Sequence, residues 1–459
     1  MSGDRAAAEA RFEEGGRHLA VGETREAEAC FREALGLDPG FAEAHANLGL
    51  LLDETGRREE AEQCYRRALA LNPCLGKTWS NLGLLLAVQK RFGEAEAAHR
   101  RALALSPDSA VARSNLGVLQ ACRQREDEAE RTYRTALALD PSYRPASFNL
   151  GCLLLRQGRY EEGWRRFEGR SWYAHLERHL PCPRWRGEPL QGRSIVVGFE
   201  AGHGDMIQFC RYVPVLKARG AARIDLICHP ALQRLFTTLA GVDTVFPFDA
   251  PIPDGGWDFW TPPMSAPYYC RTRLHSIPAA IPYLRADGEL LQKWAALLAP
   301  AGLFRVGLAW KGNPRFENDA DRSLPSLEEL APLGRIGGVR FFSLQKGAGE
   351  EEAASPPAGL PVTNLAPGIA DFADLAAITA QLDLVVCVDT AVAHLAGALG
   401  TPCWVLLPDY MTDWRWLEGR TDSPWYPVGM RLFRQRTMGD WGPVVAGVAA
   451  SLRRLRGEG

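Results

Sequence analysis

The chain has 459 residues, of which 46% are hydrophobic and 24% charged, enough for about three domains of ordinary soluble composition. A formal net charge of −2 argues against a nucleic acid or an anionic membrane as partner. The start lacks the apolar core of a signal peptide, and no window approaches about 18 uninterrupted apolar residues. The 11 cysteines contain no C-x-x-C pair. We therefore expect a cytoplasmic protein with reduced thiols, no membrane span and no metal site.

The first third of the chain repeats itself with a period of 34 residues. Each unit places a glycine in a first helix, two alanines and an aromatic residue in a second helix, and a proline after it. The positions are held by Gly15, Gly49, Gly83, Gly117 and Gly151; by Ala27, Ala61, Ala95 and Ala129; by Ala34, Ala68, Ala102 and Ala136; by Phe31, Tyr65, Tyr133 and Phe167; and by Pro39, Pro73, Pro107 and Pro141. This pattern matches the tetratricopeptide repeat. It predicts an all-α solenoid of about five repeats over residues 1–175.

The repeat pattern weakens at its end. In the fifth unit, Arg170 stands where a small alanine is expected and His175 stands where the proline should be; earlier in the array, His99 breaks the aromatic set. We therefore expect the array to run into the next domain instead of ending in a polar cap.

One asparagine recurs in the first helix of successive units, at Asn47, Asn81, Asn115 and Asn149. A ladder of amides on the concave face of a solenoid can hydrogen-bond an extended peptide without reading its sequence. Asparagine before Leu-Gly is also a common choice in these repeats, so both interpretations stay open.

Residues 176–193 are rich in Pro, Arg and Trp and are predicted to be a connector. Residues 194–300 then predict a first Rossmann-like lobe, which begins with a strand over 194–199 and a Gly-rich turn over 200–205. A helix over 206–220 and a strand over 223–228 follow.

A second Rossmann-like lobe is expected over residues 301–442, with strands over 304–310 and 339–344. Two such lobes place ligands at the carboxyl ends of the strands. A last amphipathic helix is predicted over 443–459, and it is a candidate to pack back on the first lobe.

The Gly-rich turn of the first lobe contains G-H-G-D at 202–205. Asp205 is predicted to be a general base for an acceptor hydroxyl, with His203 as a second candidate. The alternatives are a helix N-cap for Asp205 and a solvated loop residue for His203. Arg211, further along the helix, is expected on the surface, with a position that reaches the cleft as the alternative.

The second lobe contains the segment DLVVCVDTAVAHLAGALGTPCWVLLP, residues 383–408. It predicts a buried strand over 383–388, a helix that starts at Asp389-Thr390 and stops at Gly400, and a strand over 403–407. A helix N-terminus at this edge favours an anion, so the free N–H groups, the Thr390 hydroxyl and His394 predict a diphosphate site. An ordinary capped helix with a packing histidine is the alternative.

Two loops of the second lobe carry further candidates. Lys311 and Asn313 follow the first strand and suit a phosphate and a sugar or base edge, respectively. Asp319-Ala320-Asp321 fits D-x-D, but it lies in a polar loop, so no metal is predicted there. Trp414 and Arg415 are predicted either to stack on a nucleobase or to pack in the protein.

Gly204-Asp205 and the segment Val388-Asp389-Thr390-Ala391-Val392-Ala393-His394-Leu395-Ala396-Gly397-Ala398-Leu399 resemble the bacterial ADP-heptose:lipopolysaccharide heptosyltransferase-like family, of two-lobe GT-B type. The resemblance covers most of residues 194–445. It implies that Asp205 is the catalytic base, that Asp389, Thr390 and His394 contact the nucleotide diphosphate, and that Lys311 is a basic phosphate contact. Ala391 stands where the family usually has glycine, and its backbone N–H remains.

The layout of repeats followed by two lobes also resembles that of O-GlcNAc transferase, in which the array feeds a peptide acceptor to the cleft. We therefore expect a glycosyltransferase that is metal-independent, inverting and without a cofactor. It would move a sugar from a nucleotide-diphosphate sugar to a hydroxyl of a protein recruited by the repeats. A catalytically inactive tetratricopeptide scaffold and a nucleotide-sugar epimerase are the alternatives.

Overall fold

The structure is a computed structural model that describes residues 2–253, 255–298, 302–316 and 318–457. It divides into two units, Met1–Leu153 and Leu154–Gly459, which we describe separately. This division falls earlier than the predicted end of the array at residue 175, and the predicted lobe boundary at 300/301 lies outside the described residues. No helix in the described ranges is long and apolar enough to cross a membrane.

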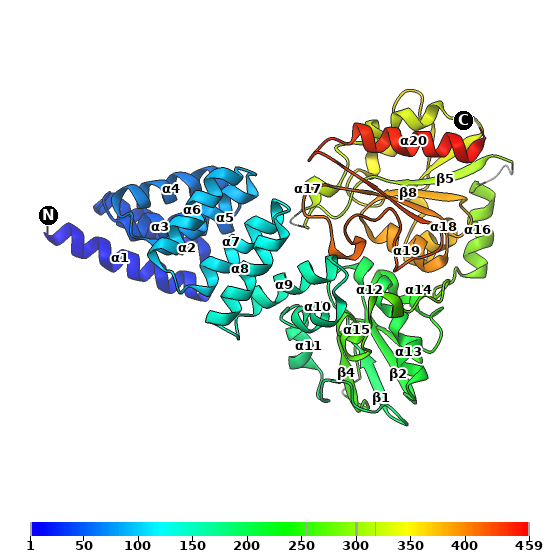
Figure 1. The fold of residues 1–459 in the computed structure, drawn as a ribbon, viewed down its shortest axis with the longest axis horizontal. Helices are drawn as coiled ribbons and strands as arrows, with labels where there is room; N and C mark the ends of the chain where they lie inside the picture. The colour runs from blue at the N-terminus through cyan, green and yellow to red at the C-terminus, as the bar shows by residue number, and fades with distance from the viewer. Residues whose placement is uncertain (1, 254, 299–301, 317, 458–459) are drawn as a thin grey trace. The chain divides into compact units, whose positions relative to one another are not determined.

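The first unit consists of antiparallel helix pairs (Figure 1). The helices are α1 (Ser2–Val21), α2 (Thr24–Leu37), α3 (Ala42–Glu54), α4 (Arg58–Leu71), α5 (Gly76–Val88), α6 (Phe92–Leu105), α7 (Ala110–Cys122), α8 (Glu126–Leu139) and α9 (Arg144–Arg156), which runs into the second unit. A Cβ on Gly49 would lie 2.8 Å from the Tyr65 ring, so the glycine permits the close approach of paired helices. The predicted tetratricopeptide solenoid is confirmed.

The first lobe of the second unit is built on a parallel sheet with the strand order β3-β2-β1-β4. Its elements are α10 (Tyr160–Phe167), α11 (Ala174–His179), β1 (Ser194–Val197), α12 (His203–Phe209), α13 (Val213–Ala218), β2 (Arg223–Cys228), α14 (Gln233–Phe236), β3 (Thr244–Pro247), β4 (Phe259–Thr261) and α15 (Ala266–Tyr269). The single helix predicted over 206–220 is wrong. Pro214 lies in the first turn of a new helix, because proline has no N–H to continue the preceding one.

The second lobe contains a parallel sheet with the order β10-β9-β8-β5-β6-β7. Its elements are α16 (Gly288–Leu298), β5 (Phe304–Ala309), α17 (Asp319–Arg322), β6 (Val339–Ser343), β7 (Val362–Asn364), α18 (Phe372–Thr379), β8 (Leu384–Val388), α19 (Ala391–Leu399), β9 (Cys403–Leu407), β10 (Met430–Arg434) and α20 (Gly442–Arg456). Every residue of β8 and β9 is buried, as expected for strands covered on both faces. Helix α19 ends at Gly400 in the left-handed conformation (φ 79°), as predicted. The two Rossmann-like lobes are therefore confirmed.

Helix α20 packs on the second lobe (Figure 1). Val444, Val448 and Leu452 recur on one face of the helix and belong to the same buried cluster as Val306 of β5 and Leu330. The idea that this helix returns to the first lobe is wrong, because its apolar face is buried against the second sheet. The last two residues of the predicted 443–459 helix lie outside the described residues.

The two lobes of the second unit meet through the helices that follow their central strands. Helix α12 of the first lobe packs against α19 of the second (Figure 1). The Gly-rich turn and the start of α19, which are almost 200 residues apart in the sequence, are therefore neighbours.

Candidate active site

Helix α19 starts at the carboxyl edge of the second sheet, directly after β8. Thr390 is its N-cap residue, yet the Thr390 side chain makes no capping hydrogen bond. Asp389 is buried, and burial together with the charge of Asp413 raises the pKa of its carboxyl to about 6. Arg322 and Arg415 oppose that rise. The start of the helix therefore has no side-chain cap from Thr390 and lies close to two cationic side chains.

His394 lies one turn into α19 and is buried. Its Nδ1 is 2.8 Å from the Tyr426 hydroxyl, and its ring stacks on Trp416 with centroids 5.4 Å apart. Burial lowers the pKa of His394 well below its usual value, and the charges of Arg415 and Arg211 act in the same direction. The imidazole is therefore neutral at pH 7.

Asp205 lies in the first turn of α12. Its Oδ2 accepts a hydrogen bond of 2.8 Å from the Gly202 amide, and its Oδ1 forms an ion pair with Arg415 of the second lobe. Asp205 is thus not the N-cap of α12, as the alternative had it; Gly202 is the N-cap, and Asp205 is the third residue of the helix, whose carboxylate accepts from the Gly202 amide. The same carboxylate also links the two lobes.

His203 is not a solvated loop residue. Its ring stacks on Phe372 of α18 at 5.1 Å and lies 4.5 Å from the ring of His229. Burial lowers the pKa of His203 to about 4, and the neighbouring His229 adds to the effect. His203 is therefore an uncharged contact between the lobes.

Gly204 shows how closely the two halves of the site approach. A Cβ at this position would lie 2.9 Å from Cδ2 of His394 and 3.3 Å from Cα of Ala391. The structure thus brings together the predicted base, Asp205, and the predicted diphosphate group, Asp389, Thr390, Ala391 and His394.

Lys311 and Asn313 point to other partners. The Lys311 ammonium donates to the carbonyl of Pro325 at 2.7 Å and lies 3.7 Å from a carboxylate oxygen of Glu352. Asn313 is exposed and accepts from the Arg315 amide at 3.0 Å. In this structure neither side chain is shown in contact with the start of α19.

In the D-x-D segment, the Asp319 carboxylate is paired with neighbouring side chains. Asp319 is buried, pairs with Arg322 at 3.2 Å and accepts a hydrogen bond of 3.0 Å from the Ser323 hydroxyl. Arg322 was not among the residues predicted from the sequence, although it acts electrostatically on both Asp389 and His394.

Trp414 packs inside the protein. Its ring lies 5.3 Å from Trp164, 5.6 Å from Phe167 and 6.2 Å from Trp425. These contacts match the packing alternative, and they leave Trp414 only 7% exposed. The aromatic faces that would receive a nucleobase are covered in this structure.

Arg415 is buried between the lobes and is not an open stacking surface. Besides Asp205, it donates from Nε to Oε1 of Gln208 at 2.6 Å and from Nη1 to Asp413 at 2.7 Å. The sequence singled out Arg415 but gave no sign of these partners. Gln208 lies 207 positions earlier in the chain.

Arg211 contradicts the expectation of a surface charge. It is 2% exposed and donates to the carbonyl of Trp425 at 2.6 Å and to the Tyr283 hydroxyl at 3.0 Å. Those partners lie 214 and 72 positions away, so no local sequence signal reveals them.

The four recurring asparagines lie on α3, α5, α7 and α9, one in each first helix. All four are half-buried, and Asn115 Nδ2 donates to the Ser80 hydroxyl at 3.3 Å. The structure therefore places one asparagine on each of four successive first helices, as a ladder requires.

Glu14, His18 and Cys30 in the first repeat have possible metal-ligand atoms within 4.8 Å of one another. Glu14 accepts from Arg11 at 2.8 Å, and His18 Nδ1 lies 2.5 Å from Glu23. Burial raises the pKa of the Cys30 thiol. A protonated thiol and a carboxylate paired with arginine are poor ligands for a cation.

Comparison with known proteins identifies both parts of the chain. Residues 12–73, 75–142 and 123–163 match tetratricopeptide-repeat profiles, and residues 329–406 match the profile of glycosyltransferase family 9 (heptosyltransferase). The chain therefore contains tetratricopeptide repeats and, over residues 329–406, a segment that is similar to the family 9 glycosyltransferases. The matched part of the family 9 domain contains Asp389, Thr390, Ala391 and His394. Asp205, Lys311 and Arg415 lie outside it.

A curated relative of the chain is protein FlbA of Caulobacter vibrioides (strain ATCC 19089 / CIP 103742 / CB 15), 30% identical over 319 residues. The alignment covers 64% of this chain and 53% of FlbA, so the chain spans about half the length of the curated relative it matches. Among solved structures, PilF of Pseudomonas aeruginosa is 26% identical, with a TM-score of 0.35 over 38% of this chain and 81% of that one. MamA of Desulfovibrio magneticus RS-1 is 21% identical, with a TM-score of 0.32 over 38% and 96% of the respective chains.

Proposed function

We propose that the protein is a glycosyltransferase that moves a sugar from a nucleotide-diphosphate sugar to an acceptor hydroxyl. One observation carries the proposal. The turn that bears Asp205 and the start of α19, which lies in the family 9 match, belong to different lobes and meet at Gly204. A two-lobe transferase needs this juxtaposition of an acceptor base and a donor diphosphate group.

The donor half of the proposed site is the start of α19. Its first backbone N–H groups and the Thr390 hydroxyl, which does not cap the helix, suit the diphosphate oxygens. Arg322 and Arg415 supply positive charge close to Asp389 and His394. Preorganised cations of this kind stabilise the charge that grows on the departing diphosphate. We therefore propose that arginines take the role of a metal, and that the reaction is metal-independent and needs no cofactor.

The acceptor half is Asp205. In this structure its carboxylate is held by the Gly202 amide and Arg415. A diphosphate bound at α19 competes with Asp205 for the Arg415 guanidinium, which releases Oδ1 to take the proton of an acceptor hydroxyl. We propose that the hydroxyl activated by Asp205 attacks the anomeric carbon directly as the nucleoside diphosphate leaves, a single in-line displacement that inverts the anomeric centre. Donor binding and activation of the base are thereby coupled.

The proposed acceptor is a protein, and the tetratricopeptide array recruits it. The support is the row of half-buried asparagines on α3, α5, α7 and α9. Amide side chains at regular spacing suit the backbone of an extended peptide.

The test compares Asp205→Asn and His394→Ala with the parent protein on a panel of nucleotide-diphosphate sugars, with release of the nucleoside diphosphate as the readout. Asp258→Asn is the matched control, because Asp258 is a carboxylate of the same lobe that pairs with Arg193 and the Ser194 amide, away from the turn. We expect Asp205→Asn to lose about 10²- to 10⁴-fold in turnover, and the control to keep it. Turnover should persist in the presence of a chelator.

Other results identify the alternatives. Parent-like turnover in both variants contradicts the assigned roles. A protein that binds no donor, yet captures a partner through its repeats, is a scaffold. Conversion of the donor to an isomeric sugar without any acceptor indicates an epimerase.

A further inference from the structure

Arg170 departs from the repeat pattern, and its surroundings explain why. The equivalent position in the preceding units is alanine, from Ala34 to Ala136. Arg170 follows α10, and its side chain is 0% exposed. A fully buried arginine is stable only when charged and polar partners replace the lost water.

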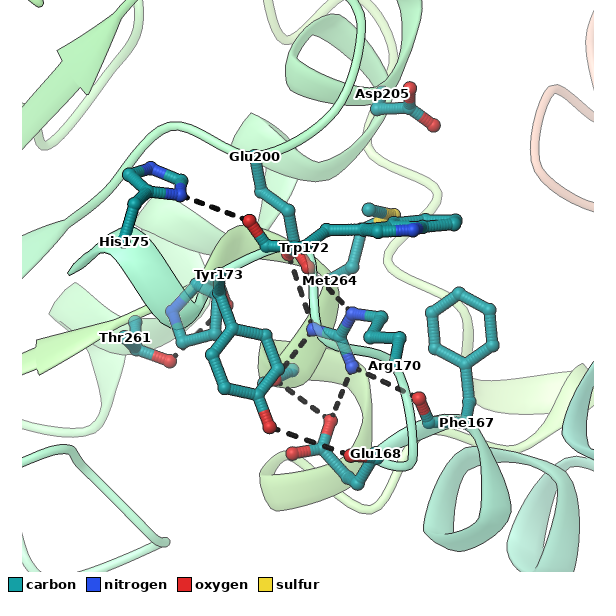
Figure 2. Close-up of polar contacts among 12 residues, drawn as sticks. Phe167, Glu168, Arg170, Trp172, Tyr173, His175, Glu200, Asp205, Thr261 and Met264 are labelled. Atoms are coloured by element: carbon teal, nitrogen blue, oxygen red, sulfur yellow. Dashed lines mark hydrogen bonds and ion pairs between the residues drawn. The ribbon is translucent and has the colours of Figure 1, made fainter. Parts of the chain in front are cut away.

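Those partners surround the guanidinium on every side (Figure 2). Nε and Nη2 of Arg170 donate to the two carboxylate oxygens of Glu200 at 2.6 and 3.1 Å. Nη1 donates to Glu168 at 2.7 Å and to the Phe167 carbonyl at 3.3 Å, and Nη2 also donates to the Ser265 hydroxyl at 2.7 Å. The bidentate contact with Glu200 is the geometry in which arginine fixes a carboxylate most firmly.

A second arginine completes the cluster. Arg184, from the predicted connector, pairs with Glu168 and donates to the Ser265 and Tyr173 hydroxyls at 2.9 and 2.8 Å. Two arginines and two glutamates make the buried set neutral as a whole. Arg184 does not appear among the hydrogen-bond partners of Glu200 in the described structure, so only Arg170 connects the cluster to that residue by an ion pair.

Glu200 lies in the turn between β1 and α12, five positions before Asp205. The next residue, Ala201, has φ 58°, a left-handed conformation that is unfavourable for a non-glycine residue. The turn is also held by His229, whose Nε2 lies 2.9 Å from the Ala201 carbonyl oxygen. The backbone conformation of this turn is therefore not set by its local sequence and depends on contacts with residues outside the turn.

We propose that Arg170 is a positioning residue: by holding Glu200 it fixes the turn 198–205 that presents Asp205 to α19. The segment after the last repeat helix thus acts as part of the support of the active site, which explains why the repeat pattern changes at this position. The catalytic consequence rests on the transferase function proposed above, whereas the anchoring of the turn does not. Figure 2 shows Arg170 with Glu168 and Glu200, together with Asp205.

Two variants test the anchor. Glu200→Gln keeps the shape of the side chain and removes its charge, and Arg170→Lys keeps the charge and removes the bidentate contact. Asp225→Asn is the matched control, because Asp225 is an equally buried carboxylate of the same lobe that pairs with Arg223 and Trp257 instead. Circular dichroism confirms that each full-length variant is folded, and if Glu200→Gln does not fold, Arg170→Lys carries the test.

The first readout is amide hydrogen exchange of residues 199–206, measured by mass spectrometry. We expect exchange of this peptide to accelerate roughly tenfold or more in Glu200→Gln, less in Arg170→Lys, and not in Asp225→Asn. Unchanged exchange in both anchor variants overturns the proposal.

The second readout is turnover of a nucleotide-diphosphate sugar. A displaced base lowers kcat about 10- to 100-fold, whereas the KM for the donor stays within about twofold because the second lobe is untouched. Faster exchange with an unchanged kcat overturns the positioning role. If the parent turns over no donor in the panel, the proposed function fails, and the exchange comparison still decides whether Arg170 anchors the turn.

Discussion

Asp389 is the residue whose charge most directly opposes a bound diphosphate. Burial raises the pKa of its carboxyl to about 6, so the group is largely neutral below that pH and negative above it. The diphosphate of a nucleotide sugar keeps its charge over this range. We therefore predict that the KM for the donor rises about tenfold as the pH increases from 5 to 7, from the repulsion between the buried Asp389 carboxylate and the diphosphate.

Asp389→Asn should remove this pH dependence, because the amide stays neutral throughout. The measurement is the donor KM at several pH values for the parent, the variant and Asp422→Asn, in which an exposed carboxylate paired with Arg420 is lost. The same slope in Asp389→Asn as in the parent would assign the pH effect to another group.

His99 gives a second residue-scale prediction, independent of the proposed function. It occupies the aromatic position of its repeat, is fully buried, and neither ring nitrogen has a hydrogen-bond partner in the described structure. Burial lowers its pKa to about 4 from a usual 6.5. A histidine held neutral in this way stabilises the fold fully above pH 6.5, and this contribution is lost as the pH falls towards 4.

His99→Phe restores the residue type found at Phe31 and removes the titration. We expect the free energy of unfolding of the variant to gain about 2 kcal/mol on the parent between pH 7.5 and pH 5. Urea unfolding at both pH values measures it, and His275→Phe, at an exposed position, is the control. A constant difference between variant and parent would show that His99 does not titrate as described.

At the scale of elements, the contact between α12 and α19 brings the two halves of the site together. Gly204 lies in this contact, where an added Cβ would be 2.9 Å from His394. Gly204→Ala favours the helix itself, since alanine is the better helix former, but it pushes the lobes apart. We predict a retained fold and a roughly 10- to 100-fold loss of donor turnover.

The control for this change is Gly288→Ala, at the start of α16, where an added Cβ meets no atom within 4 Å. Kinetics and circular dichroism of both variants provide the comparison. Turnover of Gly204→Ala equal to that of the control would mean that the close contact between the lobes is not needed for the reaction.

Elements were predicted well where the cause of their structure is local. The strand β2 and the strand β9 have the predicted limits, because runs of β-branched and apolar residues between turn signals determine them. The start of α13 at Val213 differs from the single predicted helix, because Pro214 interrupts the helix in spite of the apolar periodicity of the segment.

Side-chain partners cannot be predicted for another reason. Arg211 and Arg415 pair with residues 72 to 214 positions away, which only the packing of the two lobes brings close.

At the scale of the whole molecule, the chain joins a solenoid to a two-lobe unit. Each of these two parts contains one of the two most specific sequence patterns. The period of 34 residues and the Asp389 to Leu399 motif were both readable, because each is a regular or contiguous pattern. The buried cluster of Arg170, Arg184, Glu168 and Glu200 was not readable, since its members come from separate segments. Residue identity alone showed only that Arg170 did not fit the repeat.

The final prediction concerns the array, and it separates binding of a peptide by the repeats from hydrolysis of the donor by the second unit. Replacing Asn47, Asn81, Asn115 and Asn149 by alanine removes the proposed amide ladder and leaves the second unit unchanged. Binding of the full-length protein to unstructured synthetic peptides should weaken at least about 30-fold, because four lost hydrogen bonds at about 0.5–1.5 kcal/mol each sum to about 2–6 kcal/mol. Hydrolysis of the donor in the absence of peptide should stay the same.

The dependence of the loss on peptide sequence shows how the array recognises a peptide. Because amides contact the peptide backbone, the loss should be similar for peptides of different sequence, whereas side-chain recognition would weaken some peptides and spare others. Asn72→Ala is the control, since Asn72 lies between two helices of the array and accepts a hydrogen bond from the Cys74 amide. If the fourfold variant binds all peptides as the parent does, the recurring asparagine serves the packing of the repeats, and recruitment of the acceptor must depend on another surface.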